Sequence, residues 1–264
     1  MSLDDIDFAE RYRQHLRRAG RPSKPPGAWD RRAAALVGKP VGGAYAEAFI
    51  RLMDCSGARS LLDVGCGPGT LCVPLAARFE RIHALDYSPG MLACLQAHID
   101  ALGLDNIRPL QRAWEDDWSD VPRCDILIAS RSSMIEDLDA ALDKINRHTR
   151  LRAYLTQLAG GHFLDPAIAS LLGREQPALP DHIYTLNLLH QRGIHPGVNY
   201  IETPGRLAGA GSFDEFAEKV AGAFGAVDDG QREALASWYA ADPQRARRGG
   251  APMRWAFISW DVPR

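Results

Sequence analysis

Three glycines at alternate positions follow an acidic residue in the stretch DVGCGPG (63–69). The apolar run Ser60–Val64 before them predicts a buried strand, and helix-like sequence resumes after them. Because glycine has no Cβ, a turn at Gly65 and Gly67 can adopt positive φ and bring bare backbone against a ligand. The free N–H groups of the following helix would point to the same place. The spacing therefore predicts a ligand-binding turn with Asp63 at its edge.

The glycine spacing also indicates which ligand fits. Dinucleotide-binding turns have the pattern G-x-G-x-x-G, with glycine or alanine at the sixth position. Counted from Gly65, the sixth position here is Thr70. A carboxylate at Asp63 would also repel a pyrophosphate. The turn therefore favours a ligand with cationic or hydroxyl groups and argues against NAD.

A second acidic residue, Asp86, ends the next predicted strand in HALDYSPGML (83–92). In nucleotide-binding βαβ units, an acidic residue about 20 positions after the turn accepts hydrogen bonds from the ribose hydroxyls. Each hydrogen bond to a charged acceptor contributes on the order of 1.5–3 kcal/mol. The two stretches together predict a nucleoside site.

Together, LLDVGCGPGT (61–70) and ALDYSPGML (84–92) resemble the first two motifs of class I S-adenosylmethionine-dependent methyltransferases, and the resemblance extends over about residues 60–161. It implies an α/β, Rossmann-like fold with a seven-stranded, mostly parallel sheet, helices on both faces and an antiparallel last strand. It also implies S-adenosyl-L-methionine as the cofactor and S-adenosyl-L-homocysteine as the product. By this resemblance, Asp86 holds the ribose hydroxyls, and Tyr87 and Met91 border the adenine. The turn residues expected to lie against the methionine and ribose parts are Asp63, Gly65, Cys66, Gly67 and Gly69.

The third motif of the family is altered in this chain. The family often has Gly-Asp-Ala after the third strand, with the acidic residue at the adenine amino group. This chain has QRAWEDDW (111–118), with Arg112 and Ala113 at the corresponding place. Trp114, through its backbone or ring, or Glu115, through its carboxylate, could contact the adenine instead. The alternative is that the segment is a solvated turn.

The fourth predicted strand, CDILIASRSSM, delivers Ser130 and Arg131 to the edge where open α/β sheets bind ligands. Ser130 is a candidate cofactor contact. Arg131 could bind an anionic group of the substrate, or form a salt bridge with a nearby carboxylate. The family members that methylate DNA carry an Asn/Asp-Pro-Pro-aromatic motif or a cysteine here. Neither is present, because Cys124 lies at the other end of the strand, and a nucleic-acid substrate is disfavoured.

No catalytic residue is assigned from the sequence. A methyl sulfonium is a strong electrophile, so alignment of the acceptor and exclusion of water can suffice for transfer. His162 in AGGHFLD is the candidate general base, and a packing or surface role is the alternative. Trp29 could cover the sulfonium or the substrate with its aromatic face, or pack in the core. The spacing of His182, His190 and His195 is not that of a metal pair, and no metal is expected.

Composition places the chain among ordinary globular proteins. It has 264 residues, 46% of them hydrophobic, and a net charge of −2, which gives no general attraction to nucleic acids or membranes. Its start is too polar for a signal peptide, and its five cysteines form no CxxC pair. We therefore expect a cytoplasmic protein with reduced thiols and a small-molecule substrate. The basic cluster of Arg11, Arg13, Arg17, Arg18, Arg21 and Lys24 could contact RNA, but a solvated helix face is the default.

The predicted organisation is a single methyltransferase domain over 1–264. It comprises an N-terminal helical cap (1–50), a cofactor-binding core (51–161), a substrate-side insertion (162–211), and C-terminal helices with a closing strand (212–264). The prolines and glycines of GRPSKPPG (20–27) predict a break in the N-terminal helical segment. Asp30 is predicted to be the N-cap residue of a helix over 31–36. Ser212 and Glu215 form a capping-box pattern. The predicted strands are Ser60–Val64, Arg81–Leu85, Ile107–Gln111, Asp125–Ala129 and Ala153–Leu158, with GVNYIE and RWAFISW as an antiparallel pair, and the predicted helices include Met91–Ala101, Leu138–His148 and a segment around 181–194.

The leading functional hypothesis is methyl transfer from S-adenosyl-L-methionine to a small molecule. The alternatives are a non-catalytic S-adenosylmethionine-binding protein, an RNA methyltransferase and an NAD(P)-dependent oxidoreductase. The acceptor atom and the oligomeric state cannot be predicted from these residues.

Overall fold

The computed structural model describes residues 3–20 and 25–263. Arg21, Lys24 and part of the predicted break at 20–27 lie outside the described residues. The chain divides into two compact units. The first contains Met1–Gln157, His182–Ile201 and Ala256–Arg264, and the second contains Leu158–Asp181 and Glu202–Trp255. In the described ranges, no helix has both the length and the apolar character needed to cross a membrane.

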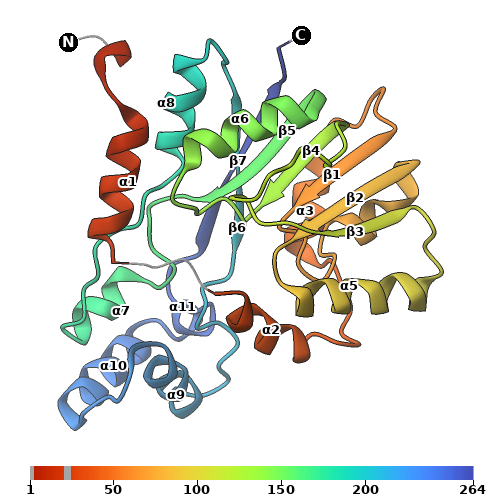
Figure 1. The fold of residues 1–264 in the computed structure, drawn as a ribbon. Coiled ribbons are helices and arrows are strands. Elements are labelled where there is room, and N and C mark those ends of the chain that lie inside the picture. The colour runs from red at the N-terminus through yellow and green to blue at the C-terminus, as the bar shows by residue number, and fades with distance from the viewer. Residues whose placement is uncertain (1–2, 21–24, 264) are drawn as a thin grey trace. The chain divides into compact units, whose positions relative to one another are not determined.

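A seven-stranded sheet has the order β3-β2-β1-β4-β5-β7-β6 (Figure 1). β1 pairs in parallel with β2 on one side and with β4 on the other. β2 pairs in parallel with β3, and β4 with β5. The predicted strands are confirmed, although β5 begins at Thr149 rather than Ala153. The bounds are β1 (Ser60–Val64), β2 (Arg81–Asp86), β3 (Ile107–Gln111), β4 (Cys124–Ser130), β5 (Thr149–Leu158), β6 (Gly197–Thr203) and β7 (Met253–Asp261).

The last strand, β7, is antiparallel, as predicted. The N–H of Val262 donates to the carbonyl of Leu151, and the N–H of Ala159 donates to the carbonyl of Arg254. Residue numbers therefore fall along β7 while they rise along β5, which defines an antiparallel pair. The fold is the Rossmann-like architecture that the motifs implied.

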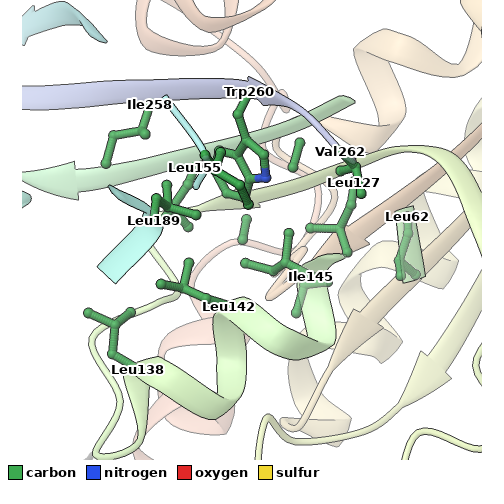
Figure 2. Packing of buried hydrophobic residues seen from close by; sticks show 14 of the residues in the cluster. Leu62, Leu127, Leu138, Leu142, Ile145, Leu155, Leu189, Ile258, Trp260 and Val262 are labelled. Atoms are coloured by element: carbon green, nitrogen blue, oxygen red, sulfur yellow. The ribbon is translucent and has the colours of Figure 1, made fainter. Parts of the chain in front are cut away.

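One face of the sheet is covered by α6 (Leu138–His148) and α8 (Ile183–Gln191). Successive side chains of a strand alternate between faces, so Leu62 and Val64 of β1 point to this side. Figure 2 shows the apolar side chains of α6 among those of the strands and α8. Leu138, Leu142 and Ile145 follow helical spacing and give α6 its buried stripe. α1 (Phe8–Arg18) packs against α8, where the rings of Tyr12 and Tyr184 meet edge to face.

The opposite face carries Leu61, Asp63 and their neighbours at alternate positions. Phe49 of α3 (Ala44–Leu52) packs edge-on against Phe257 of β7, with ring centroids 5.0 Å apart. α5 (Pro89–Leu102) contacts β2 and β3. Helices therefore cover both faces, and the site described below lies where the parallel strands end. The short helices α4 (Cys72–Leu75), η1 (Leu3–Asp5) and η2 (Ala76–Arg78) complete this unit.

The predicted helix cap at Asp30 is wrong. α2 (Pro26–Ala34) begins earlier, with Pro26 in its first turn, because the fixed φ of proline suits a helix start. Asp30 lies inside α2, and its Oδ1 accepts hydrogen bonds from Ser88 Oγ at 2.6 Å and from the N–H of Gly90 at 2.9 Å. Asp30 therefore joins α2 to the first turn of α5 instead of capping a helix.

The second unit has its own apolar core. Its helices are α7 (Pro166–Leu171), α9 (Phe213–Phe224), α10 (Asp229–Ala241) and α11 (Pro243–Arg247). Ser212 opens α9 as predicted, but the Glu215 carboxylate accepts from the N–H of Gly211 at 2.7 Å and not from Ser212. The reciprocal capping box occurs at Asp228 and Gln231, which open α10. The core residues are Ile168, Leu172, Leu207, Ala210, Phe216, Val220 and Leu235.

Candidate functional site

The glycine turn after β1 contains three glycines with positive φ, Gly65, Gly67 and Gly69, and the space around them differs. A Cβ at Gly65 would lie 2.3 Å from the Cβ of Ser132, and one at Gly69 would lie 2.6 Å from Val73 Cγ2. A Cβ at Gly67 would meet nothing within 4 Å. Gly65 and Gly69 therefore permit close packing of the protein, whereas Gly67 borders open space in which a ligand can approach the backbone.

Asp86 joins the two sequence motifs. Its Oδ2 accepts a hydrogen bond from the N–H of Gly67 at 2.8 Å, and its Oδ1 accepts one from the N–H of Ser88 at 2.9 Å. The side chain is 7% exposed, and burial raises its pKa although these hydrogen bonds oppose the shift. Each carboxylate oxygen can accept a second hydrogen bond. Asp86 is therefore held in one orientation beside the turn and can still accept from a ligand hydroxyl.

Asp63 has a different environment. It is 2% exposed, and its Oδ2 has no hydrogen-bond partner among the described residues. Burial raises the pKa of Asp63 to about 7, against the hydrogen bonds from the thiol and N–H of Cys72. A buried acceptor without a partner is costly, and an ionised one needs a positive charge. The carboxylate therefore fits a ligand that brings a cationic donor such as an ammonium group.

The neighbouring Cys66 is buried, and burial raises the pKa of its thiol well above the ordinary value. Its Sγ lies 3.6 Å from the carbonyl oxygen of Gly67. A thiol that stays protonated is a poor nucleophile, so Cys66 is not expected to act as one, and its contact with the cofactor stays a prediction.

Trp29 and Glu115 lie near Tyr87, the residue that follows β2. Tyr87 is half-buried; burial and the charges of Asp86 and Glu115 raise its pKa, and a hydrogen bond with the Trp29 side chain lowers it. These interactions bring Trp29, Tyr87 and Glu115 together although they are far apart in the sequence. Asp30 positions Trp29 by fastening α2 to α5. Met91 lies in the first turn of α5 and is 4% exposed.

Trp114 is engaged by the protein itself. Its Nε1 donates to the carbonyl of Ser132 at 2.9 Å, and its ring stacks on Trp118 with centroids 5.2 Å apart. Its carbonyl accepts from Lys144 Nζ at 2.5 Å. Glu115 is exposed, so in this segment its carboxylate is more accessible to a ligand than the polar groups of Trp114.

Ser130 and Arg131 lie at the carboxyl end of β4, as predicted. The hydroxyl of Tyr45 lies 2.7 Å from Ser130 Oγ and 2.7 Å from Thr156 Oγ1. The Arg131 guanidinium carbon lies 4.0 Å from the centroid of the Tyr45 ring. Sequence reasoning missed Tyr45, since no local spacing marks a residue in the first turn of α3 as a neighbour of β4 and β5.

The histidines singled out from the sequence lie elsewhere. His162 follows β5 in the second unit, and its role as a general base stays a prediction. His182 Nε2 lies 3.1 Å from the hydroxyl of Tyr200, and the rings of His190 and His195 are 5.5 Å apart. Within the described ranges, no group of histidine, cysteine and acidic residues is arranged to hold a metal ion.

Residues 61–151 match a family model described as a methyltransferase domain. Over 273 residues the chain is 36% identical to a Haemophilus influenzae protein described as uncharacterized, with 100% of both chains covered. It is 30% identical to trans-aconitate 2-methyltransferase of Rhodococcus jostii over 140 residues, which is 52% of this chain and 48% of that protein.

Among solved structures, the chain is similar to Haemonchus contortus phosphoethanolamine N-methyltransferase 2 in complex with S-adenosyl-L-methionine. The TM-score is 0.55 at 16% identity, with 95% of this chain and 60% of that chain covered. This likeness shows a shared fold.

Proposed function

Because the chain belongs to the class I S-adenosylmethionine-dependent methyltransferase family, we propose that it transfers a methyl group from S-adenosyl-L-methionine to a small-molecule acceptor and releases S-adenosyl-L-homocysteine. One observation carries the proposal. The hydrogen bond from Gly67 to Asp86 places the open position of the turn beside a buried carboxylate, as a nucleoside site requires.

The residues around the turn fit the parts of the cofactor. Asp86 would accept hydrogen bonds from the ribose hydroxyls, and Trp29, Tyr87 and Glu115 would border the adenine. The unpartnered Oδ2 of Asp63 would accept from the ammonium of the methionine part. When bound, S-adenosyl-L-methionine supplies an electrophilic methyl group on a sulfonium. The chain then has to orient the acceptor and exclude water, which are sources of rate enhancement that need no dedicated base.

A small-molecule acceptor is favoured over a nucleic acid. The net charge of −2 provides little electrostatic attraction to phosphate backbones. The names of two similar proteins, trans-aconitate 2-methyltransferase and phosphoethanolamine N-methyltransferase 2, refer to small molecules. These names support the substrate class and leave the particular acceptor open.

Calorimetric titration with S-adenosyl-L-homocysteine, NAD and NADP tests the cofactor. We expect saturable binding of S-adenosyl-L-homocysteine alone. In thermal unfolding, this ligand should raise the free energy of unfolding by about 2.7 kcal/mol at a concentration about 100 times its dissociation constant. Transfer of a labelled methyl group to metabolites of a bacterial extract tests catalysis. Binding without any labelled product would favour the non-catalytic alternative, and binding of NAD in its place would reject the proposal.

A further inference from the structure

The segment 113–118, here called the 113–118 loop, follows β3 and is closed on itself. Trp118 Nε1 donates to the carbonyl of Ala113 at 2.8 Å, and the N–H of Ala113 donates to Asp116 Oδ2 at 2.7 Å. These hydrogen bonds join the first residue of the loop to its middle and to its last residue. Glu115 therefore lies in the middle of a closed loop, next to Asp116.

Lys144 of α6 holds the residues on either side of Glu115. Its Nζ donates to the carbonyl of Trp114 at 2.5 Å and to the carbonyl of Asp116 at 2.6 Å. The same Nζ lies 5.1 Å from the centroid of the Trp118 ring, which attracts the cation. Hydrogen bonds from a charged donor are stronger than those between neutral groups. The ammonium group therefore fixes the backbone from which the Glu115 side chain projects.

α6 gives this contact a firm support. Lys144 and His148 are four residues apart, so both lie on one face of the helix. The Nε2 of His148 lies 3.1 Å from the carbonyl oxygen of Trp118, and the two rings meet edge to face with centroids 5.3 Å apart. A group held by a packed helix is placed more precisely than one on a loop alone. The residues that α6 buries are Leu138, Ala141, Leu142 and Ile145.

Glu115 lies on the side of the loop where the adenine is expected. Its charge contributes to the raised pKa of Tyr87, the residue after Asp86, so the two side chains are near each other. Glu115 is exposed, so packing does not fix its side chain. The position of its carboxylate therefore depends on the backbone of the 113–118 loop, and through it on Lys144.

The base that a carboxylate selects depends on where the carboxylate is held. An ionised carboxylate accepts hydrogen bonds and donates none. Adenine has an amino donor at position 6, whereas hypoxanthine has a carbonyl oxygen there and an N–H donor at position 1. A carboxylate fixed opposite position 6 favours adenine and repels hypoxanthine. A mobile carboxylate could turn to the N–H of hypoxanthine and would accept both bases, so selection of adenine requires that it be held in place.

We propose that Lys144 is a positioning residue for recognition of the base: by holding the carbonyls of Trp114 and Asp116, it keeps the Glu115 carboxylate where it selects adenine over hypoxanthine. The inference rests on the proposed function, because it needs the adenosyl group between Asp86 and the 113–118 loop. It goes further in that it assigns the selection of the base to a residue of α6 that touches no part of the cofactor.

The experiment titrates the full chain in a calorimeter with S-adenosyl-L-homocysteine and with S-inosyl-L-homocysteine, which differ only in the base. Lys144→Met removes the ammonium group but keeps an unbranched side chain against Trp118, and Lys144→Arg restores a cationic donor. Glu115→Gln replaces the carboxylate by an amide, which can donate or accept and so suits either base. The double variant tests whether Lys144 acts through Glu115. Arg147→Gln is the matched control, because it removes a cation of the same helix that donates to the Asp143 carbonyl.

We expect the wild type and Arg147→Gln to bind S-adenosyl-L-homocysteine at least about tenfold more tightly than S-inosyl-L-homocysteine, as one hydrogen bond to a charged acceptor predicts. Lys144→Met should lower this ratio to about threefold or less, and Lys144→Arg should restore it. Lys144→Gln, a milder change that keeps a neutral donor, should give an intermediate ratio. Glu115→Gln should lower the ratio as well, and addition of Lys144→Met to it should lower the ratio no further. Partial unfolding of a variant removes sites for both ligands equally, so it does not change the ratio.

The outcomes separate this inference from the proposed function. A ratio in Lys144→Met equal to that of the wild type, or a further fall in the double variant, overturns the inference. A wild type that binds both ligands equally well also overturns it, while the proposed function stands. If S-adenosyl-L-homocysteine does not bind the wild type at all, the proposed function fails and the inference fails with it.

Discussion

Cofactor affinity should fall as the pH is lowered from 8 to 6, because Asp63 takes up a proton in this range. Burial raises the pKa of Asp63 to about 7, so the carboxylate is largely ionised at pH 8 and largely protonated at pH 6. Only the ionised form attracts the cationic donor that its unpartnered Oδ2 is proposed to bind. With a pKa near 7, the competent fraction changes about tenfold across these two units, which corresponds to about 1.4 kcal/mol.

Calorimetric titration of S-adenosyl-L-homocysteine at pH 6, 7 and 8 measures this change. Repeating the titration at pH 6 in two buffers of different ionisation enthalpy should reveal release of about one proton, since binding favours the ionised carboxylate. Asp63→Asn is the matched variant, because it keeps the shape and removes the titration. It should bind weakly at all three pH values. An affinity that does not vary with pH in the wild type, or that varies equally in Asp63→Asn, would refute the assigned role of Asp63.

The stability of the unliganded protein provides an independent check on Asp63, because it should decrease as the pH rises, whereas cofactor affinity should increase. The folded protein holds a proton on Asp63 up to about pH 7, whereas the unfolded chain loses it near 3.8. The folded state therefore binds more protons between these values, and stability decreases as the pH rises through them. The full effect of this difference in pKa is about 4 kcal/mol. Asp63→Asn should remove this contribution, so denaturant unfolding should show the variant gaining stability relative to the wild type as the pH rises.

Four further variants test the contributions of single residues to binding and to folding. Asp86→Asn should weaken S-adenosyl-L-homocysteine binding about ten- to a hundredfold, because it removes the charge from the hydrogen bonds to the ribose. It should also cost about 1–3 kcal/mol in stability, because the amide keeps one acceptor oxygen for the two N–H groups of Gly67 and Ser88. Unchanged affinity in calorimetry would contradict the assignment of the ribose. Gly67→Ala and Gly69→Ala both place a Cβ at positive φ, but only the Cβ at position 69 would meet Val73 and Leu95. Gly69→Ala should therefore cost about 1–3 kcal/mol more in denaturant unfolding, whereas Gly67→Ala should mainly reduce ligand affinity; the reverse ranking would show that Gly67 is structural. Asp30→Ala removes the hydrogen bonds that join α2 to α5, so cofactor affinity should fall several-fold. The loss should be the same at any pH from 5 to 8, because these hydrogen bonds keep the pKa of Asp30 below its usual value and the carboxylate stays ionised over this range. Equal affinity of this variant and the wild type would rule out α2 as a cover of the site.

The parallel strands could be predicted because each is an apolar run that ends at a glycine or polar segment. This pattern lies within a few consecutive residues, so no distant contact is needed to recognise it. The start of α2 was misplaced because Asp30 is an acceptable helix cap by sequence, while Pro26 and the distant donors Ser88 and Gly90 decided its position. Tyr45 could not be predicted, because its partners lie 85 and 111 residues away in the sequence. Contacts of that range depend on which helix crosses the ends of β4 and β5, and spacing in one sequence does not contain this information.

In the proposed function, Asp63 and Asp86 divide the recognition of the cofactor between them. Asp86 accepts two backbone hydrogen bonds, so its carboxylate is already oriented before a ligand binds. Little free energy is therefore needed to reorient it on binding. Asp63 keeps one oxygen without a partner, so its ionised form becomes favourable only when a ligand supplies positive charge. A neutral nucleoside could satisfy Asp86 but would leave Asp63 protonated, and a diphosphate would be repelled by the ionised form. By this proposal, the unpartnered Asp63 oxygen would distinguish a cationic adenosyl ligand from other nucleosides.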